Sequence, residues 1–284
     1  MSQTVDRALT ILASLGEGPA SLEQAASRIG VHKSTALRLL RTLQEHGFVT
    51  RQSDQRYRLG GRLFSLAHQA LEGIDIRQVA APYLAVLNER YGHTVHLSVL
   101  EGDEVLYLDK VEARYPEHGR SWLGEESRIG RRAPAAATAA GKVLLADLPA
   151  DRLAAFLAEA ELPASAFLAE AELPARTPQS IRDPEELRTE LADVRQRGWA
   201  VDQAEYHESV NCIAAPIAGT EGTAIAACSI SAPVRVASVV ELSKLLPELL
   251  CTVEAISLAY GGSPTPRWCE NRCGAKHAVR AGRA

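Results

Sequence analysis

The 284-residue sequence lacks the features that mark several classes of protein. No apolar run approaches the roughly 18 residues that a membrane-spanning helix needs, so no membrane partner is expected. The N-terminus shows no basic segment followed by a long apolar one, so no secretion signal is predicted. Hydrophobic residues make up 46% of the chain, which is too many for a disordered protein.

Cysteines are few and unevenly placed. The five cysteines are an odd number, and all of them lie in the C-terminal third of the chain. Such a set is a poor disulfide framework and is typical of a reducing compartment. Together with the missing signal, this pattern predicts a cytoplasmic protein.

The chain also lacks a strong overall charge, because its formal net charge is only −4. That value hides an asymmetry: residues 28–62 hold eight basic and two acidic residues, whereas residues 76–284 carry a net charge of −6. A local basic patch on an acidic protein indicates a polyanion partner for that segment alone. The alternative is a solvated charged face.

Residues 1–60 carry the pattern of a winged helix-turn-helix. Apolar residues recur at helical spacing up to Gly16, which predicts a first helix. Ser21 and Gln24 form a capping-box pattern that begins a second helix. Only two residues separate the second helix from a third, at about residues 33–46. So short a turn makes the two helices cross steeply, as in a helix-turn-helix.

The third helix has one apolar and one polar face. Leu37, Leu40 and Leu43 are expected to face the core, with Leu39 at its edge. The opposite face carries short hydroxyl side chains followed by arginines, which suits the major groove of DNA. A polar turn between two short β-rich runs then predicts a hairpin in the position of a wing. The predicted DNA-binding residues are Lys33, Ser34, Thr35, Arg38, Arg41, Thr42, Arg51, Arg56 and Arg58. A winged helix that docks only on protein is the alternative.

The remainder predicts an α+β domain. Residues 61–74 form a linker helix whose apolar residues cover more than one stripe, which indicates packing against a second copy. Residues 75–262 contain two hairpin patterns, helical segments between them and an apolar helix interrupted at Pro247. A domain of this size can enclose a ligand cavity. Residues 263–284 are expected to be a disordered basic tail.

Short motifs occur in a fixed order along both halves of the chain. In chain order they are Val5-Asp6-Arg7-Ala8-Leu9, Lys33-Ser34-Thr35 with Arg38-Leu39-Leu40, Arg56-Tyr57-Arg58-Leu59-Gly60, Gly130-Arg131-Arg132-Ala133-Pro134, Ala137-Thr138-Ala139-Ala140-Gly141-Lys142, Arg197-Gly198-Trp199, Cys212-Ile213-Ala214-Ala215-Pro216 and Ser229-Ile230-Ser231. In these motifs the chain resembles the IclR family of bacterial transcriptional regulators. The resemblance covers about residues 4–262, and the order of the motifs makes it specific.

The resemblance implies a winged helix-turn-helix, a linker helix and a GAF-like domain with an antiparallel sheet and packed helices. It also implies a homodimer or dimer of dimers that binds a palindromic operator in double-stranded DNA. The effector is expected to be a small carboxylate or a sugar acid. The effector-binding residues that the resemblance implies are Ala139, Ala140, Asp202, Cys212, Ser229 and Ser231.

The chemistry of these residues agrees with that implication. Backbone N–H groups from Thr138 to Gly141, at the start of a helix, make an anion site. Ser229 and Ser231 lie on one face of a strand because side chains alternate with period two. Asp202 can accept a hydrogen bond from a ligand hydroxyl.

A catalytic site is a weaker interpretation. Cys212, His207 and Asp202 are a possible nucleophile, base and orienting group, but a spacing of five residues does not establish their geometry. No catalytic residue and no enzyme activity are therefore predicted. Cys269, Cys273 and His277 match no usual zinc motif, so no metal and no cofactor are predicted.

The sequence thus predicts a ligand-responsive DNA-binding regulator that acts as a repressor. One alternative is a constitutive, oligomeric DNA-binding regulator without an effector, and another is an enzyme with an accessory winged helix. Residues 155–164 recur letter for letter as residues 166–175, which we interpret as a duplication in a tolerant loop.

Overall fold

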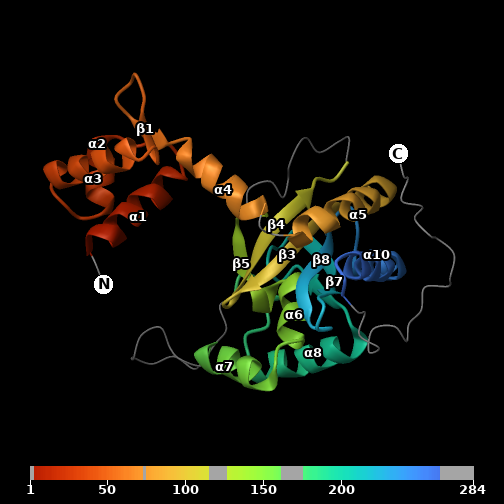
Figure 1. The fold of residues 1–284 in the computed structure, drawn as a ribbon. Coiled ribbons are helices and arrows are strands. Elements are labelled where there is room, and N and C mark those ends of the chain that lie inside the picture. The colour runs from red at the N-terminus through yellow and green to blue at the C-terminus, as the bar shows by residue number, and fades with distance from the viewer. Residues whose placement is uncertain (1–2, 73–74, 115–126, 161–174, 263–284) are drawn as a thin grey trace, which may run out of the picture. The chain divides into compact units, whose positions relative to one another are not determined.

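A computed structural model describes residues 3–72, 75–114, 127–160 and 175–262 (Figure 1). The chain divides into two compact units, residues 1–74 and 75–284. The predicted tail and most of the repeat lie outside the described residues. No helix within the described ranges is long and apolar enough to cross a membrane.

The first unit is a helical domain with a small hairpin. Its elements are α1 (Gln3–Leu15), α2 (Leu22–Arg28), α3 (Lys33–Glu45), β1 (Val49–Arg51), β2 (Tyr57–Leu59) and α4 (Arg62–Glu72).

Local signals explain where these elements begin. The capping box at Ser21 and Gln24 is present, with each side chain bonded to the other residue's backbone N–H. β1 and β2 pair antiparallel, so the predicted hairpin is confirmed. A β-bridge between Ala20 and Tyr57 joins the hairpin to the segment between α1 and α2.

The core of this unit corrects one expectation, which concerns the leucines of α3. Leu39 and Leu40 are buried whereas Leu37 is only half-buried, so the core-facing stripe of α3 is turned from the predicted one. On α1, Val5 and Leu9 are 56% and 60% exposed, and Ile11 and Leu15 form the buried face. The apolar spacing therefore predicts the helix correctly, but Val5 and Leu9 are not part of the core.

The second unit is built on one six-stranded antiparallel sheet. The strand order is β5-β4-β3-β8-β7-β6, so the two predicted hairpins lie side by side in the middle. The strands are β3 (Thr94–Glu101), β4 (Glu104–Val111), β5 (Arg132–Pro134), β6 (Ala200–Gln203), β7 (Val210–Ala218) and β8 (Ala224–Pro233).

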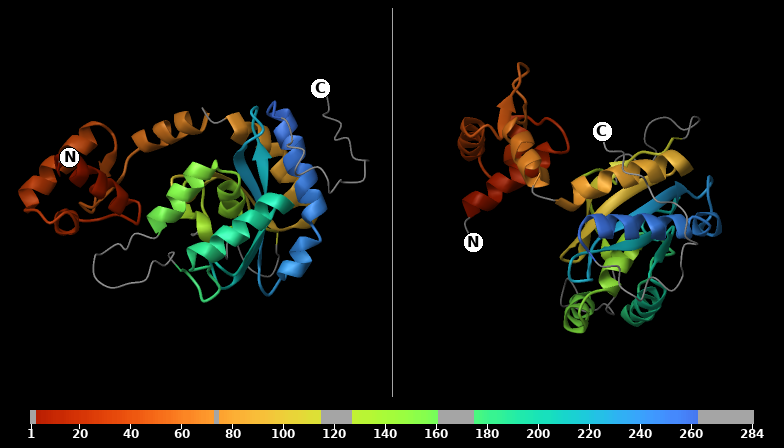
Figure 2. Two further views of the ribbon diagram at one scale, coloured as in Figure 1. Left: turned by 90° about the horizontal axis from the view of Figure 1, so that it is seen from below. Right: turned by 45° about the vertical axis from the view of Figure 1, so that its right-hand side comes forward.

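Helices cover both faces of this sheet (Figure 2). α5 (Asp75–Tyr91) and α10 (Leu246–Ala259) pack on each other and on one face. α6 (Ala139–Ala146) packs on the other face and against α8 (Pro184–Arg197). The remaining elements are the single turn Ala135–Ala137, α7 (Ala150–Ala160) and α9 (Val239–Ser243).

α6 is the buried centre of its layer, since every one of its residues is buried. Gly141 permits this, because a Cβ there would lie 2.1 Å from the carbonyl oxygen of Ala135. α6 is therefore held tightly against the preceding turn, and its N-terminus has a fixed position over the sheet.

The described cysteines agree only in part with the expectation that the chain is a poor disulfide framework. Cys212 and Cys228 are free thiols. Cys251 is disulfide-bonded, which the odd cysteine count did not predict.

Candidate functional site

The exposed face of α3 carries most of the predicted DNA-binding side chains of that helix. Lys33, Ser34, Arg38, Arg41 and Thr42 are exposed, and Thr35 is half-buried. A face of this kind, with a hydroxyl at the helix start and arginines on later turns, matches the needs of a groove-binding helix.

Intramolecular contacts distinguish the predicted basic residues from one another. Lys33 forms an ion pair with Glu23 at 2.7 Å, and the Arg51 guanidinium lies 5.6 Å from the centre of the Tyr57 ring. Arg56 donates a hydrogen bond to the carbonyl oxygen of Pro19 and so ties the hairpin to the α1–α2 connection.

Arg58 lies opposite Thr50 in the hairpin, and both side chains are exposed. Arg38, Arg41 and Arg58 are therefore the predicted arginines for which the structure gives no intramolecular partner among the described residues.

A narrow cavity lies in the second unit between the sheet and the start of α6. It gathers residues from β3, β4, β6, β7, β8 and α6, far apart in the sequence. The described lining residues are His96, Tyr107, Ser127, Thr138, Ala139, Ala140, Asp202, Tyr206, Val210, Cys212, Ser229 and Ser231.

Strand register explains why the polar lining residues meet. Asp202 pairs with Cys212 across β6 and β7, and Cys212 pairs with Ser231 across β7 and β8. Two residues before Ser231 on β8, Ser229 pairs with His96 on β3. Paired residues point to the same face of a sheet, so these side chains form two adjacent rows beneath α6.

The N-terminus of α6 closes the cavity from above. Thr138 is the N-cap, and its Oγ1 accepts a hydrogen bond from the Gly141 N–H at 3.0 Å. The N–H groups of Ala139 and Ala140 have no acceptor within the helix, because they lie in its first turn. Gly141 is not among the described lining residues of the cavity, and its N–H is used by the cap.

His96 presents a buried nitrogen to this cavity. The residue is 2% exposed, and its Nε2 has no hydrogen-bond partner among the described residues. Its Nδ1 lies 3.5 Å from Ser231 Oγ, and its ring centre lies 5.1 Å from that of Tyr107. Burial, helped by the Lys110 ammonium, lowers the pKa of His96 to about 3, so the ring is neutral.

Asp202 is the buried carboxyl of the cavity. Its Oδ1 accepts hydrogen bonds from the backbone N–H groups of Glu205, at 2.7 Å, and Tyr206, at 3.3 Å. Burial raises the pKa of Asp202 to about 7, and the neighbouring Glu205 carboxylate adds to the shift. The group therefore changes charge near neutral pH.

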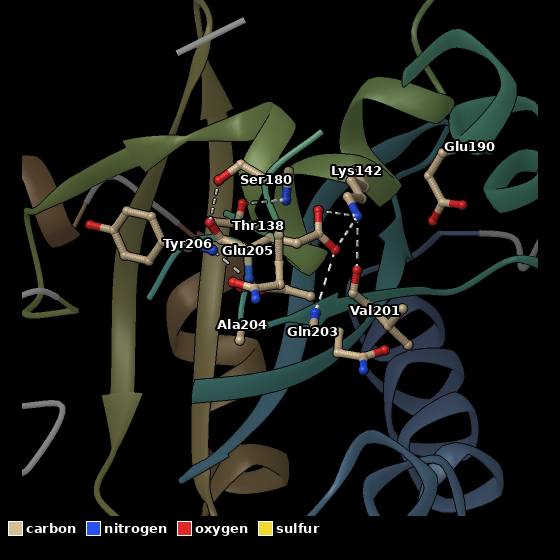
Figure 3. Close-up of polar contacts among 12 residues, drawn as sticks. Thr138, Lys142, Ser180, Glu190, Val201, Gln203, Ala204, Glu205 and Tyr206 are labelled. Atoms are coloured by element: carbon tan, nitrogen blue, oxygen red, sulfur yellow. Dashed lines mark hydrogen bonds and ion pairs between the residues drawn. The ribbon is translucent and has the colours of Figure 1, made fainter. Parts of the chain in front are cut away.

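A buried ion pair joins α6 to the loop after β6, next to the lining residue Tyr206 (Figure 3). Lys142 on α6 is 1% exposed, and its Nζ lies 2.6 Å from the Glu205 carboxylate and 3.1 Å from the carbonyl oxygen of Val201. Ser180 donates to the carbonyl oxygen of Glu205 at 2.7 Å. The loop after β6, the strand that carries Asp202, is thus fixed to α6.

The contacts of Cys212 argue against nucleophilic catalysis. Its thiol donates to Ser231 Oγ at 2.9 Å, whereas His207 Nδ1 accepts from the Ser209 N–H at 3.2 Å. Burial raises the pKa of the Cys212 thiol, so the reactive thiolate is disfavoured. No metal-binding cluster occurs among the described residues. Cys269, Cys273 and His277 lie outside them.

Comparison with known proteins agrees with this architecture. A family model for the bacterial transcriptional regulator IclR C-terminal domain matches residues 68–258, and one for the IclR helix-turn-helix domain matches residues 4–53. The chain belongs to the IclR family. It is a transcriptional regulator of that family, with a helix-turn-helix domain and a curled antiparallel sheet domain, so the predicted family and fold class are confirmed.

Relatives of this IclR-family chain cover nearly all of it. The HTH-type transcriptional regulator XynR of Escherichia coli is 37% identical over 262 residues, which are 91% of this chain and 97% of that protein. The transcriptional repressor IclR of Escherichia coli is 27% identical over 265 residues, which are 92% of this chain and 90% of that protein.

One solved relative of the IclR-family chain holds a ligand. It is an IclR homologue from Microbacterium hydrocarbonoxydans, complexed with 4-hydroxybenzoate. Its TM-score is 0.74 at 26% identity, with 90% of this chain and 98% of that chain covered.

Sequence reasoning missed several parts of the cavity. The sequence predicts His96 as a core or pocket-edge residue and Tyr107 as a packing residue, and both line the cavity. Tyr206 and the Lys142–Glu205 pair were not singled out. Only the pairing of β3 with β8 brings His96 beside Ser229, and no local signal in the sequence reveals that pairing.

Proposed function

We propose that this IclR-family regulator is a cytoplasmic, ligand-responsive repressor and not an enzyme. In this proposal residues 1–60 bind double-stranded DNA and residues 75–262 bind a small carboxylate or sugar acid. Residues 61–74 form the linker helix between these two domains. As a homodimer or dimer of dimers, the protein places pairs of α3 helices on a palindromic operator. The acid binds one conformation better than the other and so changes operator occupancy.

The observation that carries the effector role is the composition of the cavity. Of the eight residues predicted for the effector, all but Gly141 line it. They come from four separate places in the sequence, the start of α6 and the strands β6, β7 and β8, so their convergence is a property of the fold. The orphan Nε2 of His96 supports a ligand, because a buried polar atom without a partner costs free energy.

The two relatives support the remaining parts of the proposal. The name of the Escherichia coli transcriptional repressor IclR favours repression. The complex of the Microbacterium homologue favours a small acid as the effector.

A regulator without an effector is the second candidate, and the size of the cavity favours it. The cavity has a volume of only about 20 Å³, which is room for a single water molecule. An organic acid therefore requires the cavity walls to move apart. Such a requirement fits a switch, but it also fits a site that takes no ligand.

A thermal-shift screen separates the two candidates. The full-length protein is tested against small carboxylates, sugar acids and aromatic acids. A ligand that binds only the folded state stabilises it by about 2.7 kcal/mol at a hundredfold excess over its Kd. We expect at least one acid to raise the Tm, and Ser229→Ala to weaken that response.

Ser98→Ala is the matched control for Ser229→Ala. Ser98 is a buried serine of the same sheet and does not line the cavity, so its loss should leave the ligand response unchanged. If no acid raises the Tm, the regulator without an effector is the better description. If Ser229→Ala responds like the wild type, the cavity is not the effector site.

A further inference from the structure

The cavity contains buried polar groups but has no cation of its own to meet an anion. None of its described lining residues is a lysine or an arginine. Lys142 is buried one helical turn beyond Ala139, and the carboxylate of Glu205 neutralises it at 2.6 Å. Lys110 on β4, whose ammonium acts on His96, pairs with the carboxylate of Glu112 at 2.9 Å. An acid that enters this cavity therefore finds N–H and hydroxyl donors only.

The other titratable groups around Asp202 do not supply a positive charge. His96 on β3 is neutral, and the thiol of Cys212 on β7 stays protonated. Tyr107 on β4 and Tyr206 after β6 are phenols. The Arg176 guanidinium lies 5.2 Å from the centre of the Tyr206 ring, and Arg176 is not a lining residue.

Among the described lining residues, Asp202 is the group that can remove a negative charge. With Asp202 ionised, the group formed by Lys142, Glu205 and Asp202 carries a net charge of −1, and with Asp202 protonated it is neutral. Both backbone donors reach Oδ1, so Oδ2 is the atom that can carry a proton. A pKa of about 7 places both states within reach under physiological conditions.

We propose that an acid effector binds in this cavity together with one proton, which Asp202 takes up on Oδ2. The carboxylate of the ligand then accepts a hydrogen bond from the Asp202 hydroxyl instead of facing a second negative charge. This inference rests on the proposed effector role and specifies its chemistry: the site selects acids, and its affinity for them depends on pH.

The test compares each acid with its uncharged amide. The probes are lactate with lactamide, gluconate with gluconamide, and 4-hydroxybenzoate with 4-hydroxybenzamide. Isothermal titration of the full-length protein at pH 8 in two buffers of different ionisation enthalpy counts the protons taken up. We expect about one proton per bound acid at pH 8, near zero at pH 5.5, and none for an amide.

The pH dependence of the affinity gives a second readout. Above pH about 7 the Kd of an acid should rise tenfold per pH unit, because the binding-competent protonated form becomes scarcer. Asp202→Asn imitates the protonated side chain without a titratable group. Its Kd should be independent of pH, and at pH 8.5 it should bind the acid at least tenfold more tightly than the wild type.

The outcomes separate this inference from the effector role. Acid binding without proton uptake, or stronger binding of the amides, overturns the proton-linked mechanism but leaves the effector site in place. A folded Asp202→Asn that no longer binds the acid also overturns it, because an ionised Asp202 would then be needed. Failure of every acid at pH 5.5 overturns both proposals. If Asp202→Asn does not fold, the proton count of the wild type decides alone.

Discussion

Lys142 shows what a single buried charge does in this fold. Its ammonium and the Glu205 carboxylate are both withdrawn from water, and each compensates the other. Replacing one member of such a pair leaves an uncompensated buried charge, which costs about 3–5 kcal/mol. We therefore expect Lys142→Met to lower the free energy of unfolding by that amount in urea denaturation at pH 8.

The matched control is Arg188→Met on α8. Arg188 forms an exposed ion pair with Glu185 at 3.2 Å, and exposed pairs contribute at most about 1 kcal/mol. The deficit of Lys142→Met should also shrink at pH 5, because Glu205 can then take a proton; burial already raises its pKa. Equal losses for the two variants, or a loss independent of pH, would contradict this account of the buried pair.

Individual residues were predictable where a local rule applied. The alternation of a strand predicted that Ser229 and Ser231 share a face, and both line the cavity. No local rule points to Glu205. Its role arises because the loop after β6 lies against α6, a contact between residues 63 positions apart.

At the level of elements, substitutions on α3 and on the hairpin should have different effects on DNA binding. Arg38 is exposed on α3, and we expect it to contact a base edge, so Arg38→Ala should cost about 1–3 kcal/mol for the preferred DNA site. Arg58 lies on the hairpin, where the phosphate backbone is the expected partner. Arg58→Ala should therefore weaken binding to all sequences about equally and reduce the salt dependence by about one charge.

Gel-shift titrations across several salt concentrations distinguish these effects. The probes are DNA that the protein selects from a randomised pool and a duplex of shuffled sequence. Arg188→Ala in the second unit is the control, and it should leave both affinities unchanged. Arg38 is removed from the contact set if its variant keeps wild-type affinity and selectivity. A loss of selectivity in Arg58→Ala would assign the hairpin to base recognition instead.

Long periodic elements were the predictable part of the fold. The helical segments and the two hairpins predicted within residues 75–262 are present, among them α8 and the pairs β3–β4 and β7–β8. β5 and β6 were missed because three or four residues carry too little pattern. β6 matters most among these, since it supplies Asp202, and pairing with β7 rather than its own sequence makes it a strand.

For the whole molecule, the proposed switch must satisfy thermodynamic linkage. If a bound acid lowers the affinity for operator DNA by some factor, bound operator must lower the affinity for the acid by the same factor. The factor cannot exceed the ratio of the acid's affinities for the two conformations. Typical couplings of about 1–3 kcal/mol correspond to factors of about 5–150.

We therefore expect equal factors from two independent titrations at pH 6. One measures the operator Kd with and without a saturating acid, and the other measures the acid Kd with and without saturating operator. A duplex of shuffled sequence is the control, and it should change the acid Kd less than the operator does. Acid binding that leaves the operator Kd unchanged would show that the cavity holds a ligand without controlling DNA binding. Unequal factors would mean that the acid or the DNA also binds elsewhere on the protein.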